Sequence, residues 1–317
     1  MLLLPLLLAC LPDLGPRSAQ AHAGRCGDCH VEQAEAFAGS RHADAASSEL
    51  FRALRSRAPD AAACNTCHEP ERGWDCLTCH AAAGNQRTAD GLLLHDPTGP
   101  VRGPSGRQEA APHDSVADDF LTDSALCGTC HQLQGDGAFQ ETPYSHWTQS
   151  EAAERGERCQ DCHMSDLPGV AGSPGNHGFV GLQVDPVGLL TAGLELRATA
   201  DGVELVNHAG HRLPDGAAFT RELWLEGRDD GVWTGEVHLL HPQLLDADGR
   251  ETTDPFATAR VVQRGLAPDE VRRVSLEAAE ICLRYRPVAA SLVAGSPPAL
   301  DVACVLSGPR SRSRRAP

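Results

Sequence analysis

The hydrophobic pattern divides the chain into two parts. In residues 24–164, apolar positions recur at helical spacing within short segments rich in Ala, Asp and Glu, and they predict helices at 31–38, 45–57 and 149–157. After Leu182, apolar and polar residues alternate in short runs that turn dipeptides such as Asp201-Gly202 separate, which is typical of strands. The expected strands lie at 194–199, 203–207, 222–226, 233–240, 259–263, 271–276, 281–285 and 302–306.

Segments rich in Gly and Pro mark the loops between these elements. Residues 96–112 are predicted to form a surface loop, and residues 166–176 to mark a domain boundary. Seven or eight short strands within about 125 residues are typical of an immunoglobulin-like β-sandwich. The pattern therefore predicts an α + β, two-domain fold: a mostly helical or irregular domain at 22–180, a C-terminal β-sandwich at 181–308, and a disordered basic tail at 309–317.

The N-terminus begins with an apolar run that is too short to span a membrane. Residues 2–9 are mostly Leu, whereas a spanning helix needs roughly 20 apolar residues. Two interpretations fit. Residues 1–21 form a secretory signal peptide cleaved after Ala21, which we favour, or residues 7–9 form a lipobox and Cys10 carries a lipid anchor. Both predict export, to the periplasm or a similar compartment.

Composition restricts the partners and points to a cofactor. The 317 residues carry 27 Lys and Arg against 43 Asp and Glu, a formal charge of −16, so the chain has no electrostatic basis for binding nucleic acid or an anionic membrane. Aromatic residues make up only 4%, whereas Cys and His number 13 and 15. Ten of the Cys lie in five Cys-x-x-Cys-His motifs: Cys26, Cys29 and His30; Cys64, Cys67 and His68; Cys76, Cys79 and His80; Cys127, Cys130 and His131; Cys159, Cys162 and His163.

Each of these motifs has the form of a covalent attachment site for haem c. Both Cys form thioether bonds to the porphyrin, and the adjacent His becomes the proximal ligand of the iron. Zinc would require the Cys pairs to match up, and five is an odd number. Neither zinc nor disulfide bonds explain a His after every second Cys. The sequence therefore predicts five haem c groups and makes the first domain a haem-packed multihaem cytochrome c domain.

The second axial position of each iron is predicted to hold another His or to stay open. Met164 is the only Met after the first residue, and it adjoins His163, which excludes ordinary His/Met ligation and favours low potentials. The second and third motifs begin 12 residues apart, so their haems must lie close together. The His outside the motifs are His22, His42, His95, His113, His146, His177, His208, His211, His238 and His241.

Several short segments resemble the cytochrome c-554/c-prime family of multihaem cytochromes. Residues 40–43, Ser-Arg-His-Ala, are similar to that family's Ser-x-His-Ala, and residues 64–76 resemble its close pair of motifs. Residues 144–164 resemble a Glu-Trp-x-x-Ser run followed by the last motif, although His146 stands where Glu is typical. Residues 207–216 resemble the Asn-x-Gly-x-Gly-His-x-x-Pro-Thr-Gly motif of a β-domain that follows the haem domain in related proteins.

The resemblance and the local sequence nominate distal ligands. The resemblance implies His42, His113 before the fourth motif, and His211, with His208 as the alternative on the same loop. His177 is nominated because it closely follows the last motif. For the fifth iron we nominate His95, and His146 competes with it. His238 and His241 are interpreted as ordinary β-domain residues, and His22 is left open.

Two further Cys, Cys282 and Cys304, lie outside the motifs on late strands. In an exported chain we expect a disulfide bond between them rather than two reactive thiols, although sequence cannot prove the pairing.

These features favour an electron carrier over an enzyme. The leading hypothesis is an exported pentahaem cytochrome that transfers electrons between a quinol-linked donor and a terminal reductase or acceptor, with redox proteins as partners. The alternative is an oxidoreductase acting on a small nitrogen or sulfur compound at one five-coordinate haem. A third possibility makes the β-domain a docking module. No hydrolytic triad, phosphate-binding loop or zinc-protease motif supports unrelated chemistry.

Overall fold

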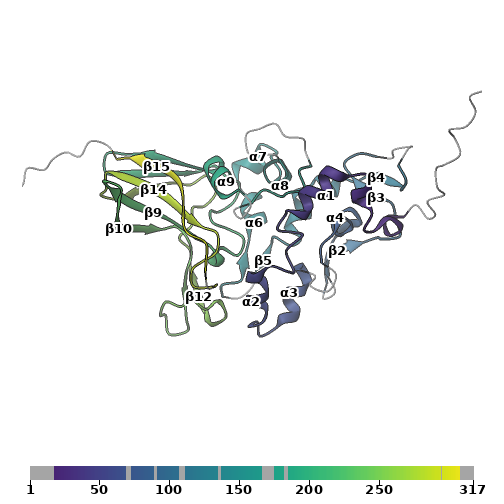
Figure 1. The fold of residues 1–317 in the computed structure, drawn as a ribbon, viewed down its shortest axis with the longest axis horizontal. Helices are drawn as coiled ribbons and strands as arrows, with labels where there is room; N and C mark the ends of the chain where they lie inside the picture. The colour runs from purple at the N-terminus through teal and green to yellow at the C-terminus, as the bar shows by residue number, and fades with distance from the viewer. Residues whose placement is uncertain are drawn as a thin grey trace, which may run out of the picture.

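The computed structural model describes residues 18–68, 73–88, 91–106, 111–134, 137–165, 175–181, 185–293 and 295–307. The molecule is elongated, with the short helices toward one end and the larger sheets at the other (Figure 1). Within the described residues, no helix is long and apolar enough to cross a membrane.

Short helices dominate the motif-bearing part, and polar caps begin several of them. Ser48, Asp75, Asp123 and Ser150 each accept a hydrogen bond from a backbone N–H in the first turn that follows. The helices are η1 (Ala19–His22), η2 (Cys26–Asp28), α1 (Val31–Ala38), α2 (Glu49–Arg55), α3 (Ala61–His68), α4 (Cys76–His80), η3 (Asp119–Thr122), α5 (Ser124–Gly128), α6 (Pro143–Trp147), α7 (Glu151–Glu154), α8 (Cys159–His163), α9 (Pro186–Gly193), η4 (Ala218–Thr220) and η5 (Pro255–Ala257).

Three small strand pairs tie the helices of this part together. β1 (Ala82–Thr88) pairs with β2 (Gly91–His95), and β5 (Leu133–Gln134) with β6 (Gln140–Glu141), both antiparallel. β3 (Val101–Gly103) runs parallel to β4 (Ser115–Ala117), so residues far apart in sequence lie side by side.

The second part is built from antiparallel sheets. The larger has the order β10 (Val232–Leu239), β9 (Glu222–Asp229), β14 (Glu280–Arg286), β15 (Leu300–Leu306). The smaller has the order β13 (Val271–Ser275), β8 (Gly202–Asn207), β7 (Leu194–Ala198). A further pair joins β11 (Gln243–Leu245) to β12 (Arg260–Val262).

One hydrophobic cluster joins the two larger sheets. Val203 and Leu205 of β8 belong to the same buried cluster as Leu225 of β9 and Leu283 of β14. Because alternate residues of a strand point to one face, each sheet contributes one apolar face to this core. The mixed α and β character is confirmed, while the immunoglobulin-like connectivity and the division into two domains stay predictions.

The structure refines several local predictions. The helix at 31–38 is confirmed as α1, whereas the helix expected at 45–57 is limited to Glu49–Arg55 and the one at 149–157 to Glu151–Glu154. The segment 96–112, expected as a loop, contributes β3, and α9 and β11 were not predicted. Residues 1–17 of the predicted signal, with the lipobox and Cys10, most of the boundary at 166–176, and the basic tail lie outside the described residues.

The expected disulfide bond is present. Cys282 of β14 and Cys304 of β15 are paired directly across the two strands, with their Cα atoms 4.1 Å apart. This bond links β14 to β15, the edge strand of the larger sheet.

Candidate functional site

The structure brings thiols of different motifs into contact. Cys26 of the first motif forms a hydrogen bond with Cys76 of the third, which lowers the pKa of Cys76 to about 7. A cavity of about 290 Å³ lies against these two Cys. In the same way Cys67 contacts Cys130, and Cys127 contacts Cys159. The motifs are therefore adjacent in the order first to third, second to fourth, and fourth to fifth.

The motif His are oriented by hydrogen bonds from Nδ1. His80 Nδ1 lies 2.6 Å from the carbonyl oxygen of Arg102, and His163 Nδ1 lies 2.7 Å from that of Val180. His68 Nδ1 lies 2.8 Å from the carbonyl oxygen of Ala45. An Nδ1–H that donates to a carbonyl fixes the tautomer in which Nε2 is free to bind a metal.

His131 differs because its partner is a carboxylate. Its Nδ1 lies 2.5 Å from Oε1 of Glu141 at the end of β6. Burial alone lowers the pKa of His131, but the charge and hydrogen bond of Glu141 outweigh burial and raise it. The pKa of Glu141 is lowered although burial opposes this, because His131 and Arg221 stabilise the carboxylate.

Four of the motif His each face a His from outside the motifs. The ring centroids are 6.4 Å apart for His30 and His113, and 6.0 Å for His80 and His177. They are 6.1 Å apart both for His131 and His42 and for His163 and His211. Each pair therefore joins a predicted proximal ligand to a predicted distal ligand.

This spacing fits an iron between the two rings. A bond from a metal to an imidazole nitrogen is about 2.0–2.1 Å long, so two imidazoles on opposite sides of one iron have ring centres about 6 Å apart. The donor set also fits, because two thiols precede the motif His in every case. The residues present are thus suited to hold haem c.

The parallel pair of β3 and β4 positions two of these sites. The carbonyl of Arg102 on β3 orients His80, while His113 lies just before β4 and reaches His30. Arg102 is fixed in turn by an ion pair with Asp118, 2.5 Å long. The strand pair therefore connects the first and third motifs.

His42 is held by a tight turn and by aromatic rings. Ser40 is buried and its Oγ accepts a hydrogen bond from the backbone N–H of Ala43, which closes the turn around His42. Trp74 stacks on His42 with centroids 5.3 Å apart, and Phe179 meets it edge-on at 4.4 Å. Burial lowers the pKa of His42 to about 4, so the ring is neutral, the form that binds a metal.

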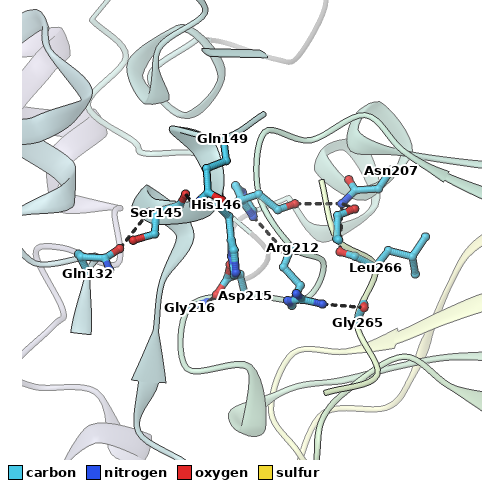
Figure 2. A network of polar contacts seen from close by, with 12 residues as sticks. Gln132, Ser145, His146, Gln149, Asn207, Arg212, Asp215, Gly216, Gly265 and Leu266 are labelled. Atoms are coloured by element: carbon cyan, nitrogen blue, oxygen red, sulfur yellow. Dashed lines mark hydrogen bonds and ion pairs between the residues drawn. The ribbon is translucent and has the colours of Figure 1, made fainter. Parts of the chain in front are cut away.

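His211 enters the site from a loop of the sheet region. The fully buried Asn207 at the end of β8 donates from Nδ2 to the carbonyl oxygen of His211, 3.0 Å away, and also to those of Leu266 and Ala267 (Figure 2). His211 Nδ1 lies 2.8 Å from the carbonyl oxygen of Arg212, which leaves Nε2 free. One buried amide therefore fixes the loop that reaches the fifth motif.

The fifth nominated ligand, His95, is not brought against a motif His in the described part of the chain. Its Nε2 lies 2.8 Å from the carbonyl oxygen of Thr78, so that nitrogen is already engaged. His146, the competing nominee, forms a hydrogen bond of 2.6 Å from Nδ1 to the buried carboxylate of Asp215 (Figure 2). The ring of His68 stacks on that of Phe51, with centroids 4.1 Å apart and nearly parallel planes.

His208, His238 and His241 have ordinary surroundings, and the side chain of His22 lies outside the described part of the structure. His208 pairs with Glu195 at 3.1 Å on an exposed surface, and His241 lies 3.1 Å from the carbonyl oxygen of Leu223. Burial and nearby arginines lower the pKa of His238. Sequence reasoning did not identify Glu141, Asn207, Trp74 or Phe179 as supporting residues, although Trp74 and Asn207 lay in segments singled out by resemblance.

Comparison with known proteins gives one family match and one match to a solved structure. Residues 25–103 match the family model described as cytochrome c554 and c-prime. The chain is similar to the crystal structure of a penta-heme cytochrome c552 from Thermochromatium tepidum, with a TM-score of 0.65 and 18% identity over 88% of this chain and 96% of that chain. No curated protein sequence gives a match.

Proposed function

We propose that this chain, a multihaem c-type cytochrome, carries five haems and transfers electrons between a quinol-linked donor and a terminal reductase or acceptor. The observation that carries this proposal is the set of four ring pairs, each joining a motif His to a second His at 6.0–6.4 Å. An iron with two axial imidazoles has no open position for a substrate, so these four sites suit electron transfer.

Each haem c, when bound, supplies a one-electron couple. The residues of this chain would hold the five haems and set the distances between them. The ten motif Cys would tether them, and His30, His80, His131 and His163 would act as proximal ligands opposite His113, His177, His42 and His211. The thiol contacts support close packing of the first motif with the third, and of the fourth motif with the second and the fifth. The penta-heme protein of the same fold supports the count of five.

Export is part of the same proposal. The disulfide bond between Cys282 and Cys304 supports an oxidising compartment, and the redox partners would be exported or membrane-bound proteins. Ala19 is fully buried, and its N–H donates to the carbonyl oxygen of Gly99 at 2.9 Å. Cleavage after Ala21, which we favour, would remove this contact, whereas processing before Cys10 would keep it.

The test is the intact mass of the mature holoprotein together with its ferric spectrum. We expect five haem increments and at least four low-spin irons. A matched variant, Cys64→Ala/Cys67→Ala, should lose one increment. Four or fewer increments in the unaltered chain, or more than one high-spin iron, would contradict the proposal. The same mass shows whether the chain starts at a lipidated Cys10 or after Ala21.

A second candidate function rests on His68. Its ring faces Phe51, and among the described side chains no His ring is paired with it. An iron there with an open sixth position could bind and reduce a small nitrogen or sulfur compound while the other four supply electrons. We then expect hydroxylamine to bind one high-spin iron within milliseconds, and the Cys64→Ala/Cys67→Ala variant to lose that binding. A wholly low-spin ferric spectrum would exclude this function.

A further inference from the structure

The two His of the fourth-motif pair are supported unequally. Glu141 holds His131 through a charged hydrogen bond of 2.5 Å, whereas the described partners of His68, His80 and His163 are neutral carbonyl groups. A carboxylate on Nδ1 increases the electron donation of an imidazole to its metal. His131 is therefore expected to be the strongest donor among these four.

His42, on the opposite side, lacks such support. Its Nδ1 atom is buried and has no hydrogen-bond partner in the described part of the chain, whereas Nδ1 of His177 and His211 each meet a backbone carbonyl. Packing against Trp74 and Phe179 holds the ring in its place. With haem bound through Nε2 of both rings, His131 would have the charged support of Glu141, whereas His42 would have no hydrogen bond at Nδ1 to support its own bond to the iron.

Phe179 is the residue of this packing whose ring we expect to move away from His42. Its backbone has φ of 49°, in the left-handed region that disfavours residues with a bulky side chain. The ring also lies 6.1 Å from that of His177, so it spans the distal ligands of the third and fourth motifs. Non-glycine residues in this conformation concentrate at functional sites, where surrounding contacts maintain the strain.

We propose that His42 is a displaceable ligand and that the fourth-motif iron is a binding site for neutral diatomic molecules such as carbon monoxide. This inference rests on the five-haem function proposed above. In the exchange, the bond between iron and His42 breaks and a bond to the diatomic forms. No electron or proton is transferred.

The experiment mixes the fully reduced holoprotein with carbon monoxide in a stopped-flow spectrometer. We expect a slow phase with the amplitude of one haem, limited in rate by the release of His42. An open iron at His68 would give a separate, fast phase. Phe179→Leu should accelerate the slow phase about tenfold, and Glu141→Gln should slow it about tenfold, in line with typical effects of residues that support a ligand. His42→Ala should convert it into a fast phase.

The control is Phe139→Leu, which alters an aromatic residue packed on Phe219 and Phe256 and should leave the slow phase unchanged. A slow phase that is absent, or that none of the Phe179, Glu141 and His42 variants alters, overturns the proposal. Haem content is measured for every variant from the pyridine complex. A chain with fewer than five haems thus contradicts the five-haem function, whereas five haems without the slow phase contradict only the displacement of His42.

Discussion

At the scale of single residues, the amide of Asn207 links the sheet region to the proposed haem sites. It is fully buried, its Nδ2 donates to three carbonyl groups, and its Oδ1 accepts from the N–H of Ala209 at 2.9 Å. No apolar side chain could satisfy these groups. The position of His211 opposite His163 therefore depends on a residue that does not itself contact a metal.

Asn207→Ala tests this dependence. We expect the free energy of unfolding to fall by about 1–3 kcal/mol, the cost of leaving buried polar groups without partners. Without the hydrogen bond from Asn207, His211 should no longer lie opposite His163 in a fraction of the molecules. We therefore expect the ferric spectrum to show up to one high-spin haem. The control is Gln243→Ala on β11. It removes hydrogen bonds to Glu251 and Arg264 and should leave the spin state unchanged. An unchanged spectrum for Asn207→Ala would show that the loop holds its shape without the amide.

At the scale of elements, the short strands and the disulfide bond have separate roles. The parallel pair of β3 and β4 lies within the motif-bearing part and positions groups around His80 and His30. The Cys282–Cys304 bond lies between β14 and β15 in the sheet that carries no proposed ligand. Substitutions in β3 or β4 should therefore alter the proposed haem sites, whereas loss of the Cys282–Cys304 bond should alter stability alone.

Removal of the disulfide bond should lower stability and leave the haem sites intact. The bond closes a segment with a sequence separation of 22 residues, and the double variant Cys282→Ala/Cys304→Ala should lower the free energy of unfolding by about 3 kcal/mol. Denaturant unfolding followed by circular dichroism measures the loss, and the ferric spectrum measures the sites. A change in spin state would mean that strain from β14 and β15 reaches the loop of His211.

At the scale of the whole molecule, a charge of −16 should govern encounters with redox partners. Opposite charges accelerate association at low ionic strength, and salt screens the attraction within roughly 10 Å at 0.1 M. The elongated arrangement in Figure 1 places the motif-bearing part at one end, where a partner can approach it without the sheets intervening.

Salt should therefore change electron-transfer rates in a direction set by the partner's charge. With a small basic redox protein as donor, we expect the second-order rate to fall at least tenfold between about 10 mM and 500 mM salt. With an acidic donor of similar potential the rate should rise instead. Stopped-flow mixing measures both. Equal salt dependence for the two donors would show that the approach does not depend on net charge.

Much of this protein follows from local sequence. A Cys-x-x-Cys-His motif brings two thiols and an imidazole together within five residues, so the sequence predicts the cofactor and its proximal ligands without a tertiary structure. Alternating runs likewise predicted strands such as β8 and β14, because a strand with one buried face repeats every two residues. His42, His113, His177 and His211 were nominated from short segments, and the structure places each opposite a motif His.

Pairing and support were decided only by the tertiary structure. The sequence cannot show that His42 faces His131, 89 positions along the chain, or that Cys26 meets Cys76, because chain folding sets these contacts. The sequence nominated His95 for the fifth iron, whereas in the structure Nε2 of His95 is hydrogen-bonded to the carbonyl oxygen of Thr78. Glu141 and Phe179 lie in no motif, and their effect on two imidazoles arises from position and charge alone. The residues predicted to attach the haems lie within short motifs of the sequence. The residues that surround their imidazoles come from distant segments, which only chain folding brings together.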